Sequence, residues 1–407
     1  MHFRIYLLDI CAREMKNNSF YSTQFWLLCL GSLFFMASFN MIIPELPDFL
    51  SSLGGAEYKG LIISLFTLTA ALSRPFSGKL TDVIGRKPIM IFGSVVLIIA
   101  SFNYLVASTI IGFLVLRLFH GMSTGFSPTG QTAILSDIVP FEKRGEAMGI
   151  FGVTASLGMA GGPALGAAIA SKYGLDAMFI GSGILAIITL FIFLSIKETL
   201  DKPKKLKLSM LRVSFVDIYE PNVRGSAIVM MLYTFSFGAI LTLIPDFSKS
   251  LGILNKGLYF TIFFIASLLS RLVAGKISDK LGRVIVIKTG LIIITLGLIL
   301  TGLADSKFMF LTGAAIYGSG SGVTSPTIFA WTIDLSNQKF RGRGISTMFL
   351  SLEIGIGVGA LISGWIFSNN TENLPVIFII CASLTLIAVF YLQIYWKNKK
   401  VKPLVIE

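Results

Sequence analysis

SRPFSGKLTDVIGR at residues 73–86 and SRLVAGKISDKLGR at residues 270–283 are two copies of one segment, and they align without a gap at an offset of 197 residues. The same offset relates further pairs of residues on the C-terminal side of each copy. These pairs are Gly121 and Gly318, Gly125 and Gly322, Asp137 and Asp334, Arg144-Gly145 and Arg341-Gly342, Gly158 and Gly355, and Gly162 and Gly359. A constant offset over so many positions indicates a duplication, so the two halves of the chain should share one fold.

The composition indicates that this fold lies in lipid. Hydrophobic residues make up 54% of the chain and charged residues 14%, at a mean hydropathy of +0.81, which is too apolar for a water-facing surface. A helix needs roughly 20 apolar residues to cross a bilayer. Such runs are predicted at 24–49, 60–80, 88–108, 110–136, 147–169, 177–196, 223–246, 257–277, 285–303, 307–332, 343–367 and 374–396. The sequence therefore predicts an all-α membrane protein of twelve transmembrane helices in two pseudo-symmetric six-helix bundles.

The longest polar stretch, residues 197–222, follows the sixth apolar run and is predicted to link the two halves. The predicted organisation is a cytoplasmic N-terminal segment (1–23), a first bundle (24–196), the linker (197–222), a second bundle (223–396) and a cytoplasmic tail (397–407). Because each unit holds an even number of spans, both copies insert in the same orientation, and a shared site should lie between them.

Basic residues gather on one side of this predicted membrane protein. Of the 34 Lys and Arg, 26 fall in the termini and in alternate loops, whereas five fall in the loops of the other side. Those five are Lys59, Lys172, Lys249, Lys256 and Lys307. This asymmetry predicts a multi-pass protein of the cytoplasmic (inner) membrane with both termini in the cytoplasm. The net charge of +13 is thus explained by topology, and no nucleic-acid partner is expected.

Over residues 24–396 the sequence resembles the major facilitator superfamily, and within it the twelve-helix drug:proton antiporters. The loop motif is carried by Gly78, Asp82, Gly85, Arg86 and Lys87, with Val83 at a usually basic position, and by its second copy at Gly275, Asp279, Lys280, Gly282 and Arg283, with Val284 at the last basic position. Further matches are Arg117 with Gly121 and Gly125, Pro44 with Pro47, and Gly149, Gly158, Gly162, Pro163 and Gly166, where Ala167 replaces a usual glycine.

The loop motif has a predicted role in gating. Gly85 should provide the backbone freedom of a tight turn. Asp82 can accept hydrogen bonds at a helix N-terminus, and the resemblance implies that this helix is the one beginning near Arg343. Such a bond would latch the halves together on the cytoplasmic side, although solvated loop charges that fix topology would give the same pattern. The remaining predicted gate residues are Asp137, Arg144, Asp334 and Arg341, which either extend this charge network or form weak surface ion pairs.

Two deep charges break the repeat: Arg117 has Ala314 as its counterpart, and Glu353 has Ser156. Burying a charge in the membrane costs at least about 2.5 kcal/mol, so these two residues need a reason to be there. We expect Glu353 to carry a coupling proton and Arg117 to shape the field around it. The alternative is a fixed ion pair or hydrogen-bonded cluster between helices.

Other polar residues receive simpler interpretations. Arg74 and Arg271 are expected to reach the cytoplasmic interface, His120 to pack or hydrogen-bond, and Asp48 and Asp246 to be solvated helix caps. Two candidates for contact with the substrate are Asn40 and Gln131. On the fifth span, Gly158, Gly162 and Gly166 share one helix face, which indicates close helix packing and, with Pro163, a bend at a moving interface.

The chain shows no nucleotide-binding loop, zinc helix or nucleophile elbow. No enzymatic activity, metal or cofactor is therefore expected. The first hypothesis is a monomeric, proton-coupled exporter of small amphipathic molecules, whose partners are the substrate, the proton and membrane lipid. The alternatives are a symporter or facilitator that imports a sugar or an organic anion, with Arg117 binding the anion, and a sensor or scaffold that retains the fold without transport.

Overall fold

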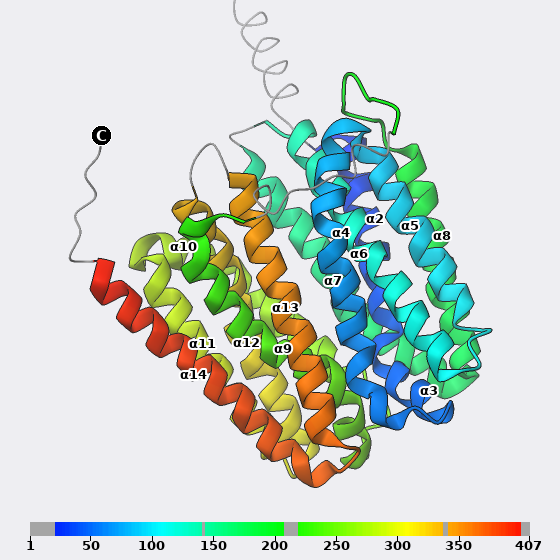
Figure 1. Cartoon of the computed structure of the whole chain (residues 1–407), viewed down its shortest axis with the longest axis vertical. Helices are drawn as coiled ribbons and strands as arrows, with labels where there is room; N and C mark the ends of the chain where they lie inside the picture. The colour runs from blue at the N-terminus through cyan, green and yellow to red at the C-terminus, as the bar shows by residue number, and fades with distance from the viewer. Residues whose placement is uncertain (1–20, 141–142, 207–218, 337–340, 400–407) are drawn as a thin grey trace, which may run out of the picture.

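In a computed structural model, the chain forms a bundle of long helices (Figure 1). The structure describes residues 21–140, 143–206, 219–336 and 341–399. These ranges contain no strand. The long helices are α2 (Thr23–Met41), α4 (Lys59–Val83), α5 (Arg86–Asn103), α6 (Ile110–Ile138), α7 (Arg144–Tyr173), α8 (Leu175–Ser195), α9 (Arg224–Ser250), α10 (Leu258–Leu281), α11 (Arg283–Gly302), α12 (Lys307–Leu335), α13 (Arg341–Phe367) and α14 (Leu374–Lys399). The short ones are η1 (Ile43–Glu45), α3 (Leu46–Ser52), η2 (Ala56–Tyr58), η6 (Pro221–Val223) and η8 (Thr371–Asn373).

Eleven of the described helical segments are long and apolar enough to cross a membrane. The remaining long helix, α12, spans 29 residues, but glycine and serine residues at 318–322 interrupt its apolar sequence. Its bounds are those of α6 shifted by the repeat offset of 197. It therefore completes the second copy, and the predicted fold class of twelve helices in two related bundles is confirmed.

The first predicted span, 24–49, is not a continuous helix. It divides into α2, η1 and α3, with Pro44 in the first turn of η1 and Pro47 in the first turn of α3. Proline has no backbone N–H and tolerates the first turn of a helix better than its interior, so two prolines three residues apart divide the segment.

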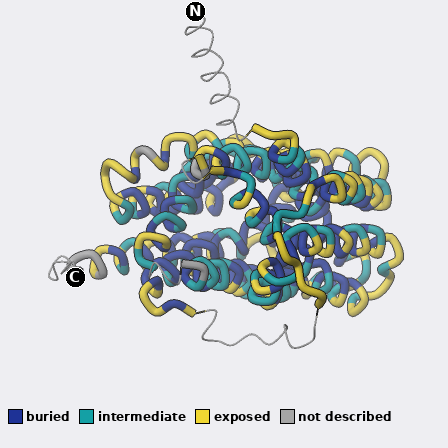
Figure 2. The backbone as a smooth tube through the Cα atoms, turned by 90° about the horizontal axis from the view of Figure 1, so that it is seen from above, coloured by how far each residue is buried: buried dark blue, intermediate teal, exposed yellow. Residues whose placement is uncertain are grey.

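The helices pack as two groups. In the N-terminal half α2 packs against α7 and α8, and α6 against α4 and α5; in the C-terminal half α9 packs against α13 and α14, and α12 against α10 and α11. Between the halves, α4 packs against α13 and α7 against α10. Buried residues gather inside the assembly and exposed residues along its rim (Figure 2).

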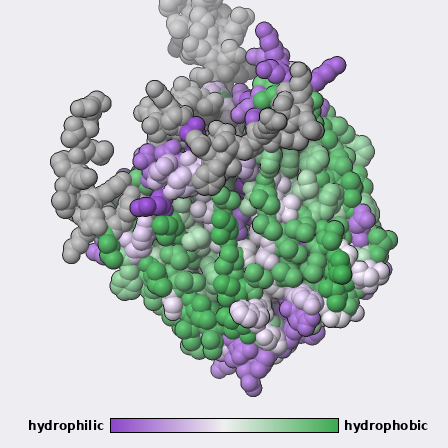
Figure 3. Space-filling model, viewed as in Figure 1, coloured by the Kyte–Doolittle hydropathy of each residue, from purple (hydrophilic) through white to green (hydrophobic). Residues whose placement is uncertain are grey.

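The surface shows where lipid would contact these helices. On the face drawn in Figure 3, hydrophobic residues form a wide band between two more hydrophilic ends. We call the upper one the linker end, because the connection that follows α8 and the first turns of α5 and α11 lie there, and the other one the opposite end, where α3 lies (Figure 1).

Candidate functional site

A cavity of about 710 Å³ lies between the two halves. Helices of both halves contribute to its wall, which includes Phe39 and Phe66 from one half and Phe237 and Phe263 from the other. Many of its small polar groups are hydroxyls, and they belong to Thr67, Thr124, Thr129, Thr132, Ser136, Ser156, Thr234, Ser267, Ser321, Ser325 and Ser346. The cavity therefore combines broad apolar contact with scattered hydrogen-bonding groups, as is usual for binding sites of small molecules.

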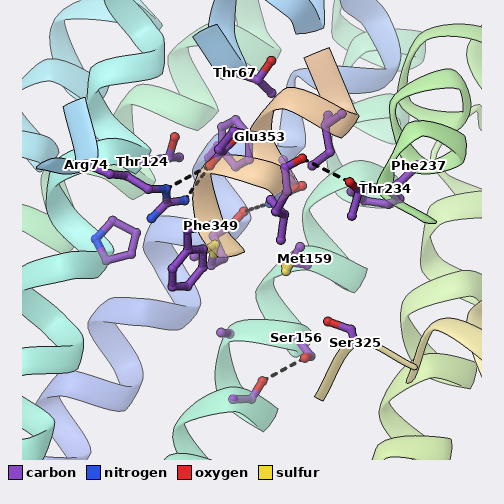
Figure 4. A pocket seen from close by; sticks show the side chains of 18 of the residues that line it. Thr67, Arg74, Thr124, Ser156, Met159, Thr234, Phe237, Ser325, Phe349 and Glu353 are labelled. Carbon is purple, nitrogen blue, oxygen red and sulfur yellow. Dashed lines mark hydrogen bonds and ion pairs between the residues drawn. The ribbon is translucent and has the colours of Figure 1, made fainter. Parts of the chain in front are cut away.

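An ion pair joins the two halves across this cavity. Arg74 on α4 donates from Nη2 to Oε1 of Glu353 on α13 at 2.6 Å and from Nε to the same oxygen at 3.2 Å (Figure 4). The Arg74 guanidinium also lies over the ring of Phe349, 4.5 Å from its centroid. Glu353 is 7% exposed. The pair is thus largely shielded from bulk solvent. In such a shielded place charge pairing is strong, and the loss of one partner is costly.

The prediction that Arg74 and Arg271 reach the interface is wrong. Both side chains line the cavity, because each lies between two and three helical turns before the end of its helix and faces the other half of the molecule instead of lipid. Arg271 differs from Arg74 in having no hydrogen bond or ion pair within the described part of the chain, and its Nε is buried without a partner.

Arg117 occupies a separate, fully buried position on α6. Its Nε donates to the backbone oxygen of Ile62 at 2.8 Å, and its Nη1 donates to the Tyr104 hydroxyl at 3.0 Å. Its guanidinium lies 4.7 Å from the centroid of the Phe66 ring. His120 completes this cluster through Nδ1, 3.2 Å from Nη1 of Arg117. The structure therefore places Arg117 in a cluster inside the N-terminal half, and places Arg74 beside Glu353.

Asp48 and Asp246 are not the solvated caps that the sequence predicts. Asp246 on α9 pairs with Lys59 of α4 at 2.7 Å, and Asp48 on α3 pairs with Lys256 at 2.7 Å. Glu45 reaches the same lysine at 2.6 Å. Each carboxylate faces a lysine of the other half. The sequence alone does not predict these contacts, because the partners are far apart along the chain. These pairs tie the halves together at the opposite end.

Lys256 lies in the connection between α9 and α10, outside the membrane-spanning helices. Burial disfavours its charged form, but hydrogen bonds to Asp48 and Glu45, together with their negative charges, outweigh this effect and hold the pKa of Lys256 above its usual value. The ammonium group is therefore charged at every physiological pH.

The glycine face of the fifth span packs inside the N-terminal half. A Cβ on Gly158, Gly162 or Gly166 would lie within 2.6 Å of a backbone oxygen of α2. Pro163 lies beside this face at the contact with α10, where Thr261 donates to the oxygen of Ala160 at 2.7 Å and Asn255 to that of Ala164 at 3.1 Å. The predicted close packing is present, and the neighbourhood of Pro163 belongs to the interface between the halves.

At the linker end the motif residues contact their own half. Arg86 pairs with Asp137 at 3.0 Å, and the repeated pair, Arg283 with Asp334, has the same distance. Arg86 lies 3.7 Å from Asp82, whose side chain is 75% exposed, and Arg283 lies 2.5 Å from Asp279. Within the part of the chain that the structure describes, Asp82 makes no hydrogen bond or ion pair with α13 in this conformation, so the latch stays a prediction. The side chains of Arg144 and Arg341 lie outside the described residues.

The turns of both motif copies need glycine. Gly85 has φ of 120° and Gly282 has φ of 88°, in a region that other residues rarely adopt. The helix that follows Gly85 is capped by Glu198, whose carboxylate accepts hydrogen bonds from the backbone N–H groups of Arg86 and Lys87. Burial disfavours the charged form of Glu198, but these and further backbone hydrogen bonds outweigh it and lower the pKa of Glu198. Gly78 lines the cavity, and nothing lies within 4 Å of a Cβ on Gly275.

The two candidate contacts for the substrate differ in position. Asn40 lines the cavity and donates from Nδ2 to the Met36 oxygen at 2.8 Å. Gln131 is not among the residues of the cavity wall; its Nε2 donates to Ser127 at 3.0 Å, and its Oε1 is buried without a partner among the described residues.

Sequence reasoning found Glu353 but missed its partner Arg74, as well as Arg271, Lys59 and Lys256. The repeat contained a signal for the first two, because Arg74 and Arg271 occupy equivalent positions in both copies of the opening motif. Two related bundles around a central cavity, with charges that join the halves, are the architecture of a membrane transporter.

Comparison with known proteins identifies the family. The family model of the Major Facilitator Superfamily matches residues 28–254 and 226–405, so the chain belongs to this superfamily. The predicted resemblance is confirmed. It is 28% identical to the multi-drug resistance efflux pump PmrA of Streptococcus pneumoniae, over 82% of this chain and 85% of that protein. It is 26% identical to the multidrug resistance protein MdtG of Dickeya zeae, over 93% of this chain and 95% of that protein.

Solved structures agree on the fold. The human organic anion transporter MFSD10 (TETRAN) superposes with a TM-score of 0.71 at 20% identity, over 91% of this chain and 100% of that one. A POT family transporter in complex with 5-aminolevulinic acid superposes with a TM-score of 0.77 at 14% identity, over 94% of this chain and 98% of that one. The chain is thus a transporter of this superfamily and not an enzyme.

Proposed function

We propose that this transporter exports small amphipathic molecules from the cytoplasm in exchange for protons, by rocking its two halves around the central cavity. The ion pair between Arg74 and Glu353 carries this proposal, because it joins α4 to α13 at the cavity wall. The multidrug efflux names of PmrA and MdtG support the direction and the substrate class. The apolar cavity wall supports an amphipathic substrate.

The coupling step follows from the charges. Ionised Glu353 holds Arg74, and a proton on the carboxylate removes the negative charge, so that the pairing of Arg74 weakens. An unpaired buried charge is costly, so a proton at Glu353 favours a conformation in which Arg74 can reach water. Proton binding and the arrangement of the halves are thereby linked.

We further propose that the protein lies in the cytoplasmic (inner) membrane and that its linker end faces the cytoplasm. The strong bias of Lys and Arg towards that side supports this orientation. The present conformation then has its extracellular end closed by Lys59, Asp246, Lys256, Glu45 and Asp48. In the opposite state, the contact of Asp82 with α13 would close the cytoplasmic end. Since the cavity lies within one chain, a monomer would suffice for transport.

The test is proton-driven transport in everted membrane vesicles. A drug and metabolite susceptibility panel on a deletion strain first identifies a substrate. Glu353→Gln should abolish accumulation of that substrate driven by a proton gradient, whereas the matched control Glu372→Gln, which changes an exposed carboxylate in η8, should retain it. Full proton-driven transport by Glu353→Gln would contradict the proposal.

The same vesicles separate the alternatives. Accumulation in everted vesicles indicates export, and accumulation in intact cells instead would indicate an importer. Absence of proton movement together with absence of substrate accumulation in both preparations would favour a sensor or scaffold.

A further inference from the structure

The cavity contains a second arginine that the proposed coupling step does not use. Arg271 on α10 is the repeat counterpart of Arg74 on α4, and both line the cavity. Arg74 has a carboxylate partner, whereas Arg271 has neither an ion pair nor a hydrogen bond among the described residues, and its Nε is buried without a partner. The side chain is half-buried in the cavity wall, so an anionic ligand there would provide the negative charge that Arg271 lacks.

The surroundings of the two arginines correspond position by position. Arg74 contacts Glu353 and the ring of Phe349 on α13. The repeat counterparts of these two residues, on α7, are Ser156 and Gly152. Arg271 does approach α7 there, since a Cβ built on Gly152 would lie 3.9 Å from its Nη1. The geometry of the pair is thus repeated, but a serine stands in place of the carboxylate and a glycine in place of the ring.

The difference leaves the cavity with a net positive charge. Among the described residues of its wall, the charged side chains are Arg74, Arg271 and Glu353. Arg74 and Glu353 neutralise each other, and the charge of Arg271 remains. Guanidinium is well suited to this role, because it stays charged and binds a carboxylate through two parallel hydrogen bonds.

We propose, as an extension of the proposed function, that Arg271 binds the carboxylate of a zwitterionic amphipathic substrate, whose ammonium group competes with Arg74 for Glu353. The substrate carboxylate takes the place that Glu353 has in the other half. The apolar body of the substrate contacts the aromatic wall, where Phe237 and Phe263 lie on the same half as Arg271. Ser325 and Ser156, from α12 and α7, lie on one side of the same cavity (Figure 4) and add hydroxyl groups there.

This arrangement also explains why proton and substrate would exchange. An ammonium group binds Glu353 only while the carboxylate is ionised, so a proton there weakens binding of the substrate. The carboxylate of the substrate contacts Arg271 in either case and provides orientation. A zwitterion therefore binds the deprotonated transporter and leaves the protonated one, as antiport requires.

The test is fluorescence binding to the full chain in detergent or nanodiscs with two probes, Nε-dansyl-lysine and its methyl ester. The first is a zwitterion with an aromatic body, and the second lacks the carboxylate. The unmodified transporter should bind dansyl-lysine more tightly than the ester. Arg271→Gln should weaken binding of dansyl-lysine about 30-fold, since loss of a buried charge partner has effects of this order, and should leave binding of the ester unchanged.

A second variant works by adding a group to the cavity. Ser156→Glu places a carboxylate at the repeat position of Glu353, so it should neutralise Arg271 and weaken dansyl-lysine to the level of the ester. Lys172→Gln removes an exposed cation at the far end of α7 and is the charge control; it should change neither affinity.

Equal affinities of the unmodified transporter for the two probes, or absence of binding by either, would overturn the proposal, as would a preference for the zwitterion that survives both Arg271→Gln and Ser156→Glu. This result is independent of Glu353→Gln transport. A charge preference that depends on Arg271 supports the substrate site even if proton coupling fails, and loss of that preference overturns the site even if coupling holds.

Discussion

The two ends of the molecule are held by charges in different ways. At the opposite end, Lys59 and Lys256 pair with carboxylates of the other half. At the linker end, the described pairs Arg86 with Asp137 and Arg283 with Asp334 each stay within one half. Pairs between halves can hold one conformation and must break in the other, whereas pairs within a half can persist through the whole cycle. The difference indicates which end is closed here and which charges are free to act as a gate.

Among these variants, removal of Lys256 is expected to weaken closure of the opposite end most. Lys256→Gln leaves Glu45 without its cation and Asp48 with only the exposed Lys249, which should destabilise closure of the opposite end by about 3 kcal/mol. The measurement is labelling of a cysteine at Ile43, a residue of the cavity wall, by an impermeant maleimide from the opposite side of the membrane. Labelling should rise strongly.

The control for this variant is Lys249→Gln, because Lys249 lies 3.6 Å from Asp48 but its side chain is 66% exposed. It should change labelling little, since exposed pairs contribute under about 1 kcal/mol. The pH dependence has a defined sign: the raised pKa of Lys256 means that its stabilisation is complete at neutral pH and is lost as pH rises through that value. Equal labelling of both variants would contradict the assignment.

Helix contact at the same end should have the next largest effect. Gly364 on α13 crosses Gly60 on α4 so closely that a Cβ on Gly364 would lie 2.5 Å from the Gly60 Cα. Gly364→Ala should therefore force the helices apart, at a cost to closure of about 1–3 kcal/mol, and raise labelling at Ile43. Gly161→Ala, where nothing lies within 4 Å of the new Cβ, is the control and should not.

At the linker end a smaller effect is expected, on stability and not on gating. Glu198→Gln weakens the cap of α5 and should lower the free energy of unfolding by about 1 kcal/mol, measured by thermal unfolding in detergent. Because the pKa of Glu198 is lowered in the folded state, its contribution is present above the ordinary pKa of glutamate and is lost as pH falls through the lowered value. A destabilisation that persists unchanged at pH values below the lowered pKa would refute this role.

The sequence contained most of the fold and part of the site. Helix positions follow from apolar runs, and the duplication follows from one constant offset; both can be read along the chain without knowing which helices contact each other. Glu353 was identifiable because it breaks the repeat. The partners of Arg74, Asp48 and Asp246 lie in the other half, at least 187 residues away. Hydrophobic periodicity carries no information about which helices of two bundles face each other. For the same reason, the sequence analysis predicts that Arg117 acts beside Glu353, whereas in the structure Arg117 bonds to Tyr104.

The central claim is that the charge of Glu353 sets the arrangement of the two halves. It can be measured as the distance between spin labels at the linker end, on cysteines at Ser195 and Ile285 in a background without the three native cysteines. Both positions are exposed and lie in different halves. A change from alkaline to acidic pH should shift this distance in the otherwise unmodified transporter, and Glu353→Gln should show the acidic distance at both pH values. A pH-dependent shift of the same size in Glu353→Gln would contradict the claim.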